Sequence, residues 1–282
     1  MKLKKWLSIG TIAVASVVLL TACGSKVDDD NVVVKVGTMA KSDSEEARWN
    51  KVEELLKDKN VTIKYTEFTD YSQPNKALEN GEIDVNAFQH YNFLNEWNKK
   101  HKTELVGIAE TYITAFRLYS GTESGKNKYT DAKDIPNKGT IVIPNDTVNE
   151  SRALYLLQSA GLIELGVSGD TFATLDDITK NDKNLDIVEV DAAQTARQLQ
   201  SADAAVINND FVVEAGIDPS KAIFIEPKSD NAKQWYNLIA AKKDWKKAKN
   251  ADAIQAVVDA YQTDDVKKVI KDSSKGLDEP VW

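Results

Sequence analysis

Apolar and polar positions alternate along the chain in blocks that predict strands and helices in turn. Residues 32–38 form a β-branched run that predicts a strand. Residues 43–59 predict a helix, because Ala47, Val52 and Leu55 fall near one face, with acidic residues early and lysines late. The same patterns predict further strands at 61–68, 83–88, 140–143, 185–190, 204–207, 222–225 and 236–242, and a long β-rich stretch at 105–119. They predict further helices at 72–78, 91–100, 149–160, 192–201, 210–215, 251–263 and 265–271.

Strands that alternate with helices at this spacing are typical of a parallel or mixed sheet with helices on both faces. The polar stretch 121–139, which contains glycines and a proline, separates two such series. The chain is therefore predicted to be an α/β protein with two lobes.

The first residues have the pattern of a secretory signal. Three lysines precede a mostly apolar stretch at 6–20, which is shorter than the roughly 20 residues that a membrane-spanning helix needs. The lone cysteine, Cys23, follows Leu20-Thr21-Ala22, which resembles a bacterial lipobox. Residues 1–22 are thus predicted to be a signal peptide and 23–31 a lipidated, acidic tether, the alternative being an uncleaved membrane helix. The lack of further cysteines fits a Gram-positive cell surface.

Composition argues against nucleic-acid binding and offers little for catalysis. The 282 residues carry a net charge of −8, whereas a nucleic-acid partner would favour a basic face. The common nucleophile, phosphate-loop and zinc-helix motifs are missing, and 121–126 is interpreted as a polar turn. With His90, His101 and a single cysteine, the sequence predicts no catalytic residue, no metal site and no cofactor.

Polar and aromatic residues gather where predicted strands end, the place where open α/β sheets bind ligands. Arg152, in the first turn of the predicted helix 149–160, suits a carboxylate, and the helix start would add free N–H groups. Asn208 and other asparagines offer carbonyl oxygens to an ammonium group. Tyr71, Phe88 and Phe93 could form apolar walls, onto which a thioether packs well. These residue types together suit a zwitterionic amino acid.

Each of these residues also has a plainer interpretation. Arg152 could be a solvated surface residue, and Phe88 an ordinary core residue. His90, at a strand end, could be a surface or capping group rather than a ligand contact at the pocket mouth. Asn208 could cap the helix that follows it.

Several segments closely resemble one known family. Asp70-Tyr71-Ser72-Gln73-Pro74-Asn75, followed by Phe88-Gln89-His90, resembles the NlpA-type lipoproteins, the substrate-binding lipoproteins of methionine ABC importers. The resemblance continues at 143–146, 152–163, 204–208 and 236–240, and ends at 280–282. It therefore covers essentially the whole chain after Cys23.

The resemblance implies a two-lobed, type II-like periplasmic-binding-protein fold, with 32–113 and 233–282 as lobe 1 and 114–232 as lobe 2. L- or D-methionine, a related amino acid or a methionyl dipeptide would bind between the lobes and pass to a membrane permease. The residues implied at the ligand are Tyr71, Phe88, His90, Phe93, Arg152, Asn208 and Asn237. Such a protein is not an enzyme; it would be anchored by lipid on the extracytoplasmic face of the cell membrane.

The sequence also departs from the family pattern. Ser151 replaces a usual glycine, and Phe93 and Phe211 replace usual tyrosines. Residues 40–44 and 114–118 differ as well. Two other classes of function stay open from the sequence: a surface interaction protein such as an adhesin, and a small-molecule hydrolase that would use one of the many carboxylates.

Overall fold

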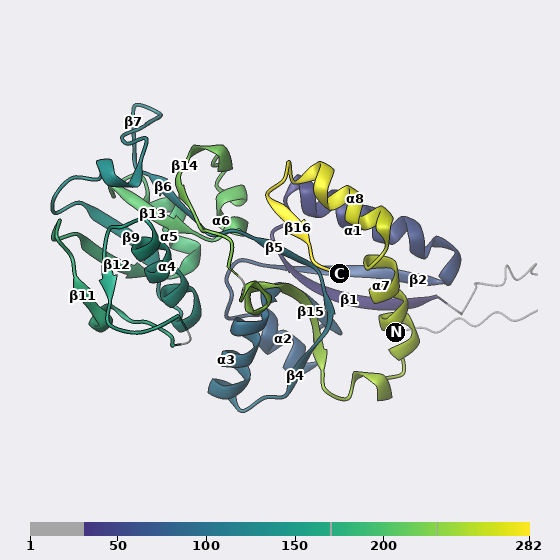
Figure 1. The fold of residues 1–282 in the computed structure, drawn as a ribbon. Coiled ribbons are helices and arrows are strands. Elements are labelled where there is room, and N and C mark those ends of the chain that lie inside the picture. Colours follow the sequence, from purple (N-terminus) through teal and green to yellow (C-terminus); the bar gives the residue numbers. More distant parts are fainter. Residues whose placement is uncertain (1–30, 170, 230) are drawn as a thin grey trace, which may run out of the picture. The chain divides into compact units, whose positions relative to one another are not determined.

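The computed structural model describes residues 31–169, 171–229 and 231–282. The predicted signal peptide, Cys23 and all but the last residue of the tether lie outside the described residues. Most of the described strands form two five-stranded sheets, each flanked by helices (Figure 1). We call the parts built on these sheets the first and second lobes.

The first lobe is built on a mixed sheet. Its strand order is β2 (Val61–Phe68), β1 (Val32–Met39), β3 (Val85–His90), β15 (Asn237–Lys242) and β4 (Leu105–Glu110). Strand β1 pairs in parallel with β2 and β3, whereas β15 runs antiparallel to β3 and β4. The return strand β15 therefore inserts a late segment of the chain between β3 and β4 of an early sheet.

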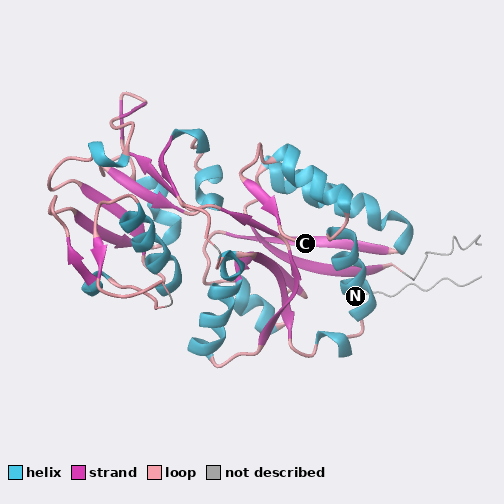
Figure 2. Cartoon of the chain, in the orientation of Figure 1, coloured by secondary structure: helices cyan, strands magenta, loops and turns pink. Residues whose placement is uncertain are grey.

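Helices cover both faces of the first sheet. On one face α1 (Asp43–Leu56), α7 (Ala251–Tyr261) and α8 (Asp264–Ser273) pack against alternate residues of β1, including Val34 and Val36. On the other face α2 (Pro74–Asn80) and α3 (Tyr91–His101) pack against Leu238 and Ala240 of β15. Figure 2 shows this flanking of strands by helices in both lobes.

The second lobe repeats the plan. Its sheet has the order β12 (Asp186–Val190), β9 (Thr140–Pro144), β13 (Ala204–Ile207), β6 (Arg117–Ser120) and β14 (Ala222–Ile225). Helix α4 (Thr147–Ser159) packs on the face that carries Ile141 and Ile143. Helices α5 (Ala192–Gln198) and α6 (Asn209–Glu214) pack on the face of Val142. This alternation follows from the two-residue period of a strand.

Smaller elements complete the fold. Three two-stranded ladders are formed by β5 (Tyr112–Thr114) with β16 (Asp278–Pro280), β7 (Thr122–Glu123) with β8 (Lys126–Asn127), and β10 (Glu164–Leu165) with β11 (Ile178–Lys180). Short 3₁₀ turns lie at Lys57–Lys59, Ala132–Asp134, Leu175–Asp177, Pro219–Lys221, Ala232–Trp235 and Trp245–Lys247. No helix among the described residues is long and apolar enough to cross a membrane.

Two extended segments join the lobes and pair with each other. The chain crosses once between β5 and β6 and returns between β14 and β15. The Phe116 N–H donates to Glu226 Oε2 at 2.9 Å, and the Glu226 N–H donates to the Phe116 carbonyl at 2.9 Å. The two-lobed α/β fold is the predicted one. The exact lobe boundaries, 113/114 and 232/233, stay predictions; the first falls inside β5 and the second within the crossing between β14 and β15.

The structure corrects several predicted elements. The β-rich stretch 105–119 is three strands, β4, β5 and β6, that belong to three different sheets. Helix α4 begins at Thr147, because the Asp146 carboxylate accepts from the N–H of Asn149 and caps the helix there. Arg152 is thus the sixth residue of α4, in its second turn, and the prediction of a first-turn position was wrong. The predicted turn at 121–126 is the small hairpin β7–β8.

Candidate functional site

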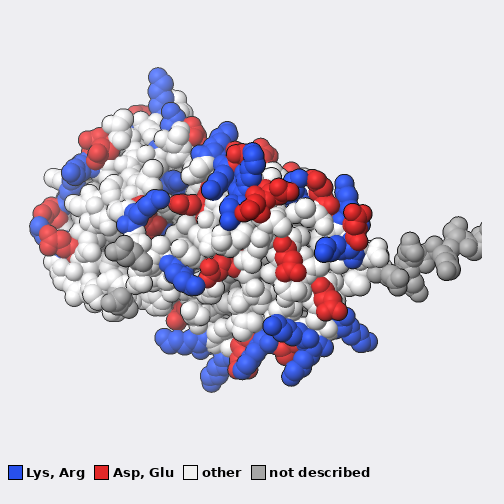
Figure 3. Space-filling view, turned by 45° about the vertical axis from the view of Figure 1, so that its right-hand side comes forward, with Lys and Arg blue, Asp and Glu red and all other residues white. Residues whose placement is uncertain are grey.

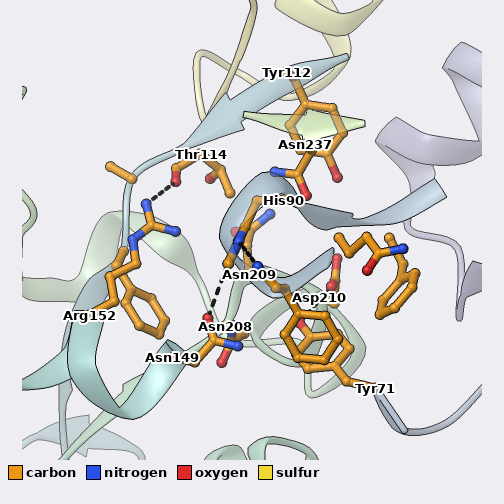
Figure 4. Close-up of a pocket in the computed structure, with 15 residues that line it drawn as sticks. Tyr71, His90, Tyr112, Thr114, Asn149, Arg152, Asn208, Asn209, Asp210 and Asn237 are labelled. Atoms are coloured by element: carbon orange, nitrogen blue, oxygen red, sulfur yellow. Dashed lines mark hydrogen bonds between the residues drawn. The ribbon is translucent and has the colours of Figure 1, made fainter. Parts of the chain in front are cut away.

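A pocket lies between the two lobes, with about 500 Å³ of space counted to its open mouth. Its walls include every ligand-binding residue predicted from the sequence: Tyr71, Phe88, His90, Phe93, Arg152, Asn208 and Asn237 (Figure 4). The structure brings all of them together, and their roles at a ligand stay predictions. Gln89, Asn149 and Asn209, which the sequence indicated near strand ends but not as ligand residues, also line the pocket, as do Tyr112, Thr114 and Asp210, which it did not indicate.

Arg152 is buried in the pocket wall and held in a fixed orientation. Its Nε donates to Glu226 Oε1 at 2.8 Å, and its Nη2 donates to Glu226 Oε2 at 2.6 Å and to the Thr114 carbonyl at 3.1 Å (Figure 4). The guanidinium also lies over the ring of Trp235, 4.4 Å from its centroid. The interpretation of Arg152 as a solvated surface residue was wrong.

One edge of this guanidinium stays available. Among the described residues Nη1 of Arg152 has no hydrogen-bond partner, so its donors can serve a ligand oxygen. Burial raises the pKa of Glu226, but the charge and hydrogen bonds of Arg152, with the N–H of Phe116, outweigh it and lower the pKa below its usual value. The pair is therefore ionised, and Glu226 orients Arg152 rather than competing for its free edge.

His90 both caps a helix and lines the pocket. Its Nδ1 accepts from the N–H of Phe93 at 3.2 Å at the start of α3, so the ring proton lies on Nε2, which is 3.4 Å from Asn149 Oδ1 in the second lobe. Burial, with the charge of Arg152, lowers the pKa of His90 to about 3. The capping interpretation is correct, and the imidazole is also neutral and buried in the pocket rather than exposed.

An aromatic cluster forms the apolar part of the pocket. The Tyr71 ring lies 5.7 Å from that of Phe88, 5.9 Å from Phe93 and 5.0 Å from Phe211, between ring centroids. Phe211 comes from α6 of the second lobe, so the cluster spans both lobes. Phe88 is 8% exposed and is at once a core residue and part of the pocket wall. These rings offer a wall for an unbranched apolar side chain.

Asparagine side chains supply the polar counterpart. Asn208 occupies the N-cap position of α6, but its side chain makes no capping hydrogen bond. The Oδ1 atoms of Asn208 and Asn209 are buried. Neither accepts a hydrogen bond from any of the described residues. Buried acceptors without partners are costly, so a ligand that brings a donor to these two oxygens would be stabilised. Asn237 begins β15 opposite His90.

Two of the departures from the family pattern lie at the aromatic part of the pocket, and a third lies away from it. Phe93 lines the pocket, and Phe211 packs on Tyr71, so both affect the aromatic wall. Ser151 points elsewhere: its hydroxyl accepts from the N–H of Ala173 at 2.9 Å and anchors the loop before Leu175.

A buried amide network supports the pocket floor and explains part of the sequence motif. Asn75 Nδ2 donates to Gln89 Oε1 at 2.9 Å, and Asn75 Oδ1 accepts from Gln89 at 2.7 Å and from Asn86 at 2.9 Å. Gln89 also donates to Asn86 Oδ1 at 2.9 Å. Side-chain amides at these motif positions thus join α2 to β3 beside the pocket, which Gln89 also lines.

Replacing Asn75 with leucine should lower the free energy of unfolding by about 1–3 kcal/mol, because the amides of Gln89 and Asn86 lose buried partners. Urea unfolding followed by circular dichroism measures this. Asn80, exposed at the end of the same helix, is the matched control, and Asn80→Leu should change stability by less than about 0.5 kcal/mol. Equal effects of the two substitutions would contradict the structural role of the network.

Acidic and basic side chains are interspersed on the face drawn in Figure 3, without a continuous basic surface there. Within the described part of the chain, no group of three or more His, Cys, Asp or Glu side chains is placed to hold a metal ion. The candidate site is therefore the pocket between the lobes.

Two α/β lobes joined by two crossings, with a polar and aromatic pocket between them, have the architecture of a solute-binding protein. A sequence profile of the NlpA lipoprotein family matches residues 34–282. The chain belongs to this family, as its sequence motifs predicted.

Individual relatives agree with this assignment. The D-methionine-binding lipoprotein MetQ of Escherichia coli (strain K12) is 34% identical over 269 residues, covering 94% of this chain and 93% of that protein. The crystal structure of the substrate-binding protein of a methionine transporter from Streptococcus pneumoniae is 60% identical, with a TM-score of 0.86 over 89% of this chain and 96% of that one. A nutrient-binding protein from Burkholderia cenocepacia, bound to methionine, is 37% identical, with a TM-score of 0.78 over 88% of this chain and all (100%) of that one.

Proposed function

We propose that this protein is the substrate-binding lipoprotein of an ABC importer, and that it captures methionine or a closely related amino acid or methionyl dipeptide. One observation carries the proposal: the free edge of Arg152, the unpartnered carbonyl of Asn208 and the aromatic cluster around Tyr71 face one pocket. The relatives, which are binding proteins of methionine transporters or bind methionine, support the same choice.

The ligand would lie across the pocket with its carboxylate at Arg152 and its side chain among the aromatic rings. Its carboxylate would accept from Nη1 of Arg152, the side of the guanidinium that Glu226 and Thr114 leave open. Its ammonium would donate to the carbonyl oxygens of Asn208 and Asn237. Its thioether chain would pack among Tyr71, Phe88 and Phe93, with His90 beside the Arg152 end.

Capture would proceed by closing of the lobes around the ligand. A ligand that touches both lobes favours the closed form, because its contacts are complete only there. The closed protein would then deliver the amino acid to a membrane permease. A lipid on Cys23 would hold it on the extracytoplasmic face of the membrane, here proposed to be a Gram-positive cell surface. The protein would catalyse no reaction and bind no nucleic acid.

A thermal-shift screen of the purified protein tests this proposal. At a hundredfold excess over its dissociation constant, a ligand should stabilise the folded protein by about 2.7 kcal/mol. We expect saturable stabilisation by L- or D-methionine or a methionyl dipeptide, and little by aspartate or lysine, whose charged side chains do not suit the aromatic cluster. Absence of saturable stabilisation by any of these ligands would favour an adhesin-like protein, and chemical turnover of the bound ligand would favour a hydrolase.

A further inference from the structure

One hydrogen bond in the pocket joins the two lobes directly. Tyr71, between β2 and α2 of the first lobe, donates its hydroxyl to Oδ2 of Asp210 at 2.7 Å. Asp210 is the second residue of α6 in the second lobe. Both side chains lie on the side of the pocket away from Arg152 in Figure 4. The contact therefore forms only when the lobes are together, and it leaves the proposed carboxylate site free.

The charges of a buried cluster in the first lobe also act on Asp210. Arg48 of α1 forms an ion pair with Asp278 of β16 and lies over the ring of Tyr112 of β5, 4.3 Å from its centroid. Glu45, one turn before Arg48, belongs to the same cluster. Closing the lobes thus brings a third carboxylate toward Glu45 and Asp278, which have one guanidinium to share.

We propose that Asp210 is a positioning residue that holds the lobes closed through Tyr71 and takes up a proton as they close, so that ligand binding tightens with falling pH. This inference rests on the proposed function, and it assigns the group that couples closing to pH. A protonated Asp210 keeps a carbonyl oxygen for the Tyr71 hydroxyl, while its negative charge no longer faces those of Glu45 and Asp278.

The direction follows from the surroundings of Asp210 in the closed form. Burial, followed by the negative charge of Glu45, raises the pKa of Asp210 to about 7; Asp278 adds to this, while the Tyr71 hydrogen bond and Arg48 act against it. In the open form, where the lobes are separated, Asp210 is exposed to water and has an ordinary pKa near 4. Between these two values the closed form binds one more proton than the open form. Affinity should therefore rise by up to tenfold per pH unit as pH falls below about 7, and level off above it.

Three other groups near the pocket could confuse this measurement. Burial raises the pKa of Asp146, which Asp210→Asn leaves in place, so any pH dependence that persists in that variant would come from Asp146. His90 has its pKa lowered to about 3, so it stays neutral from pH 5.5 to 8. Glu150 has its pKa raised to about 7 by burial and by Glu189, but both residues belong to the second lobe, on α4 and β12. The pKa of Glu150 should therefore be the same in the open and closed forms, so its titration should not change ligand affinity with pH. Glu150→Gln is therefore the matched control.

The test measures the dissociation constant of methionine by isothermal titration calorimetry between pH 5.5 and 8. We expect wild-type affinity to rise at least tenfold toward pH 5.5, with the same dependence in Glu150→Gln. Asp210→Asn, which keeps the acceptor for Tyr71 and removes the charge, should bind at least tenfold tighter than wild type at pH 8 and show no pH dependence. Tyr71→Phe keeps the ring and should bind about tenfold more weakly, with the dependence retained.

The outcomes separate the two proposals. Methionine binding that is independent of pH in the wild type, or an unchanged pH dependence in Asp210→Asn, overturns the role of Asp210 and leaves the proposed function standing. Affinity that falls toward pH 5.5 also overturns it, since Asp210 would then act as an ionised partner of the ligand ammonium. Failure to bind methionine, related amino acids or methionyl dipeptides at any pH overturns the proposed function itself.

Discussion

Arg152→Ala should weaken methionine binding by about 2–5 kcal/mol, because it removes the charged, hydrogen-bonded partner of a buried carboxylate. The effect should be large because Arg152 does not have to be ordered on binding. Glu226, Thr114 and Trp235 already hold the guanidinium with Nη1 unoccupied by the described residues. Isothermal titration calorimetry of the purified variant with methionine measures the loss.

The same substitution should also damage the folded protein, and this must be separated from binding. Without Arg152, the carboxylate of Glu226 is left largely buried without its cation. Arg152→Met combined with Glu226→Gln removes both charges, so it should recover much of the stability while binding stays lost. Arg152→Lys keeps the charge but loses the paired donors of the guanidinium, and should bind methionine more weakly than wild type. Near-normal methionine affinity in the double variant would contradict the role proposed for Arg152.

The pattern of apolar positions was sufficient for most of the fold. Strands β2 and β14 fall on the predicted residues, because each is rich in β-branched or aromatic residues and lies between turn signals. The small ladders were not predicted, because β16 contains Asp278 and Pro280 and owes its conformation to pairing with β5. Local propensity is weak there, and a partner more than 160 residues away in the sequence decides the structure.

The candidate site was predictable where residue type and position at a strand end were enough. Asn208 and His90 satisfied that rule, Arg152 and Tyr71 were indicated by residue type near such ends, and the family motif added Asn237. Their partners were not predictable in the same way. Glu226 lies 74 residues from Arg152, and Asp210 lies 139 residues from Tyr71. Neither acid differs in the sequence from the many solvated ones, so only the folded chain identifies them.

The buried cluster around Arg48 should contribute most to stability among the ion pairs of the described residues. Arg48 and Asp278 are 2% and 5% exposed, and their ion pair ties the C-terminal strand β16 to helix α1. Arg48→Met should lower the free energy of unfolding by about 3–5 kcal/mol, because Asp278 and Glu45 stay buried without their cation. Urea unfolding followed by tryptophan fluorescence measures this.

The matched control is an exposed pair, since burial and not pairing is the proposed cause. Lys243 and Glu104 form a bridge at 2.6 Å with side chains 64% and 71% exposed, and Lys243→Met should cost less than about 1 kcal/mol. Arg48→Met together with Asp278→Leu removes the unpaired charge of Asp278 and should recover part of the loss, with Glu45 accounting for the rest. If Arg48→Met cost no more than Lys243→Met, the carboxylates of Glu45 and Asp278 would have to reach water in the folded protein. Asp210 would then meet no buried negative charge on closing, so the stability of this one variant also bears on the pH dependence of binding.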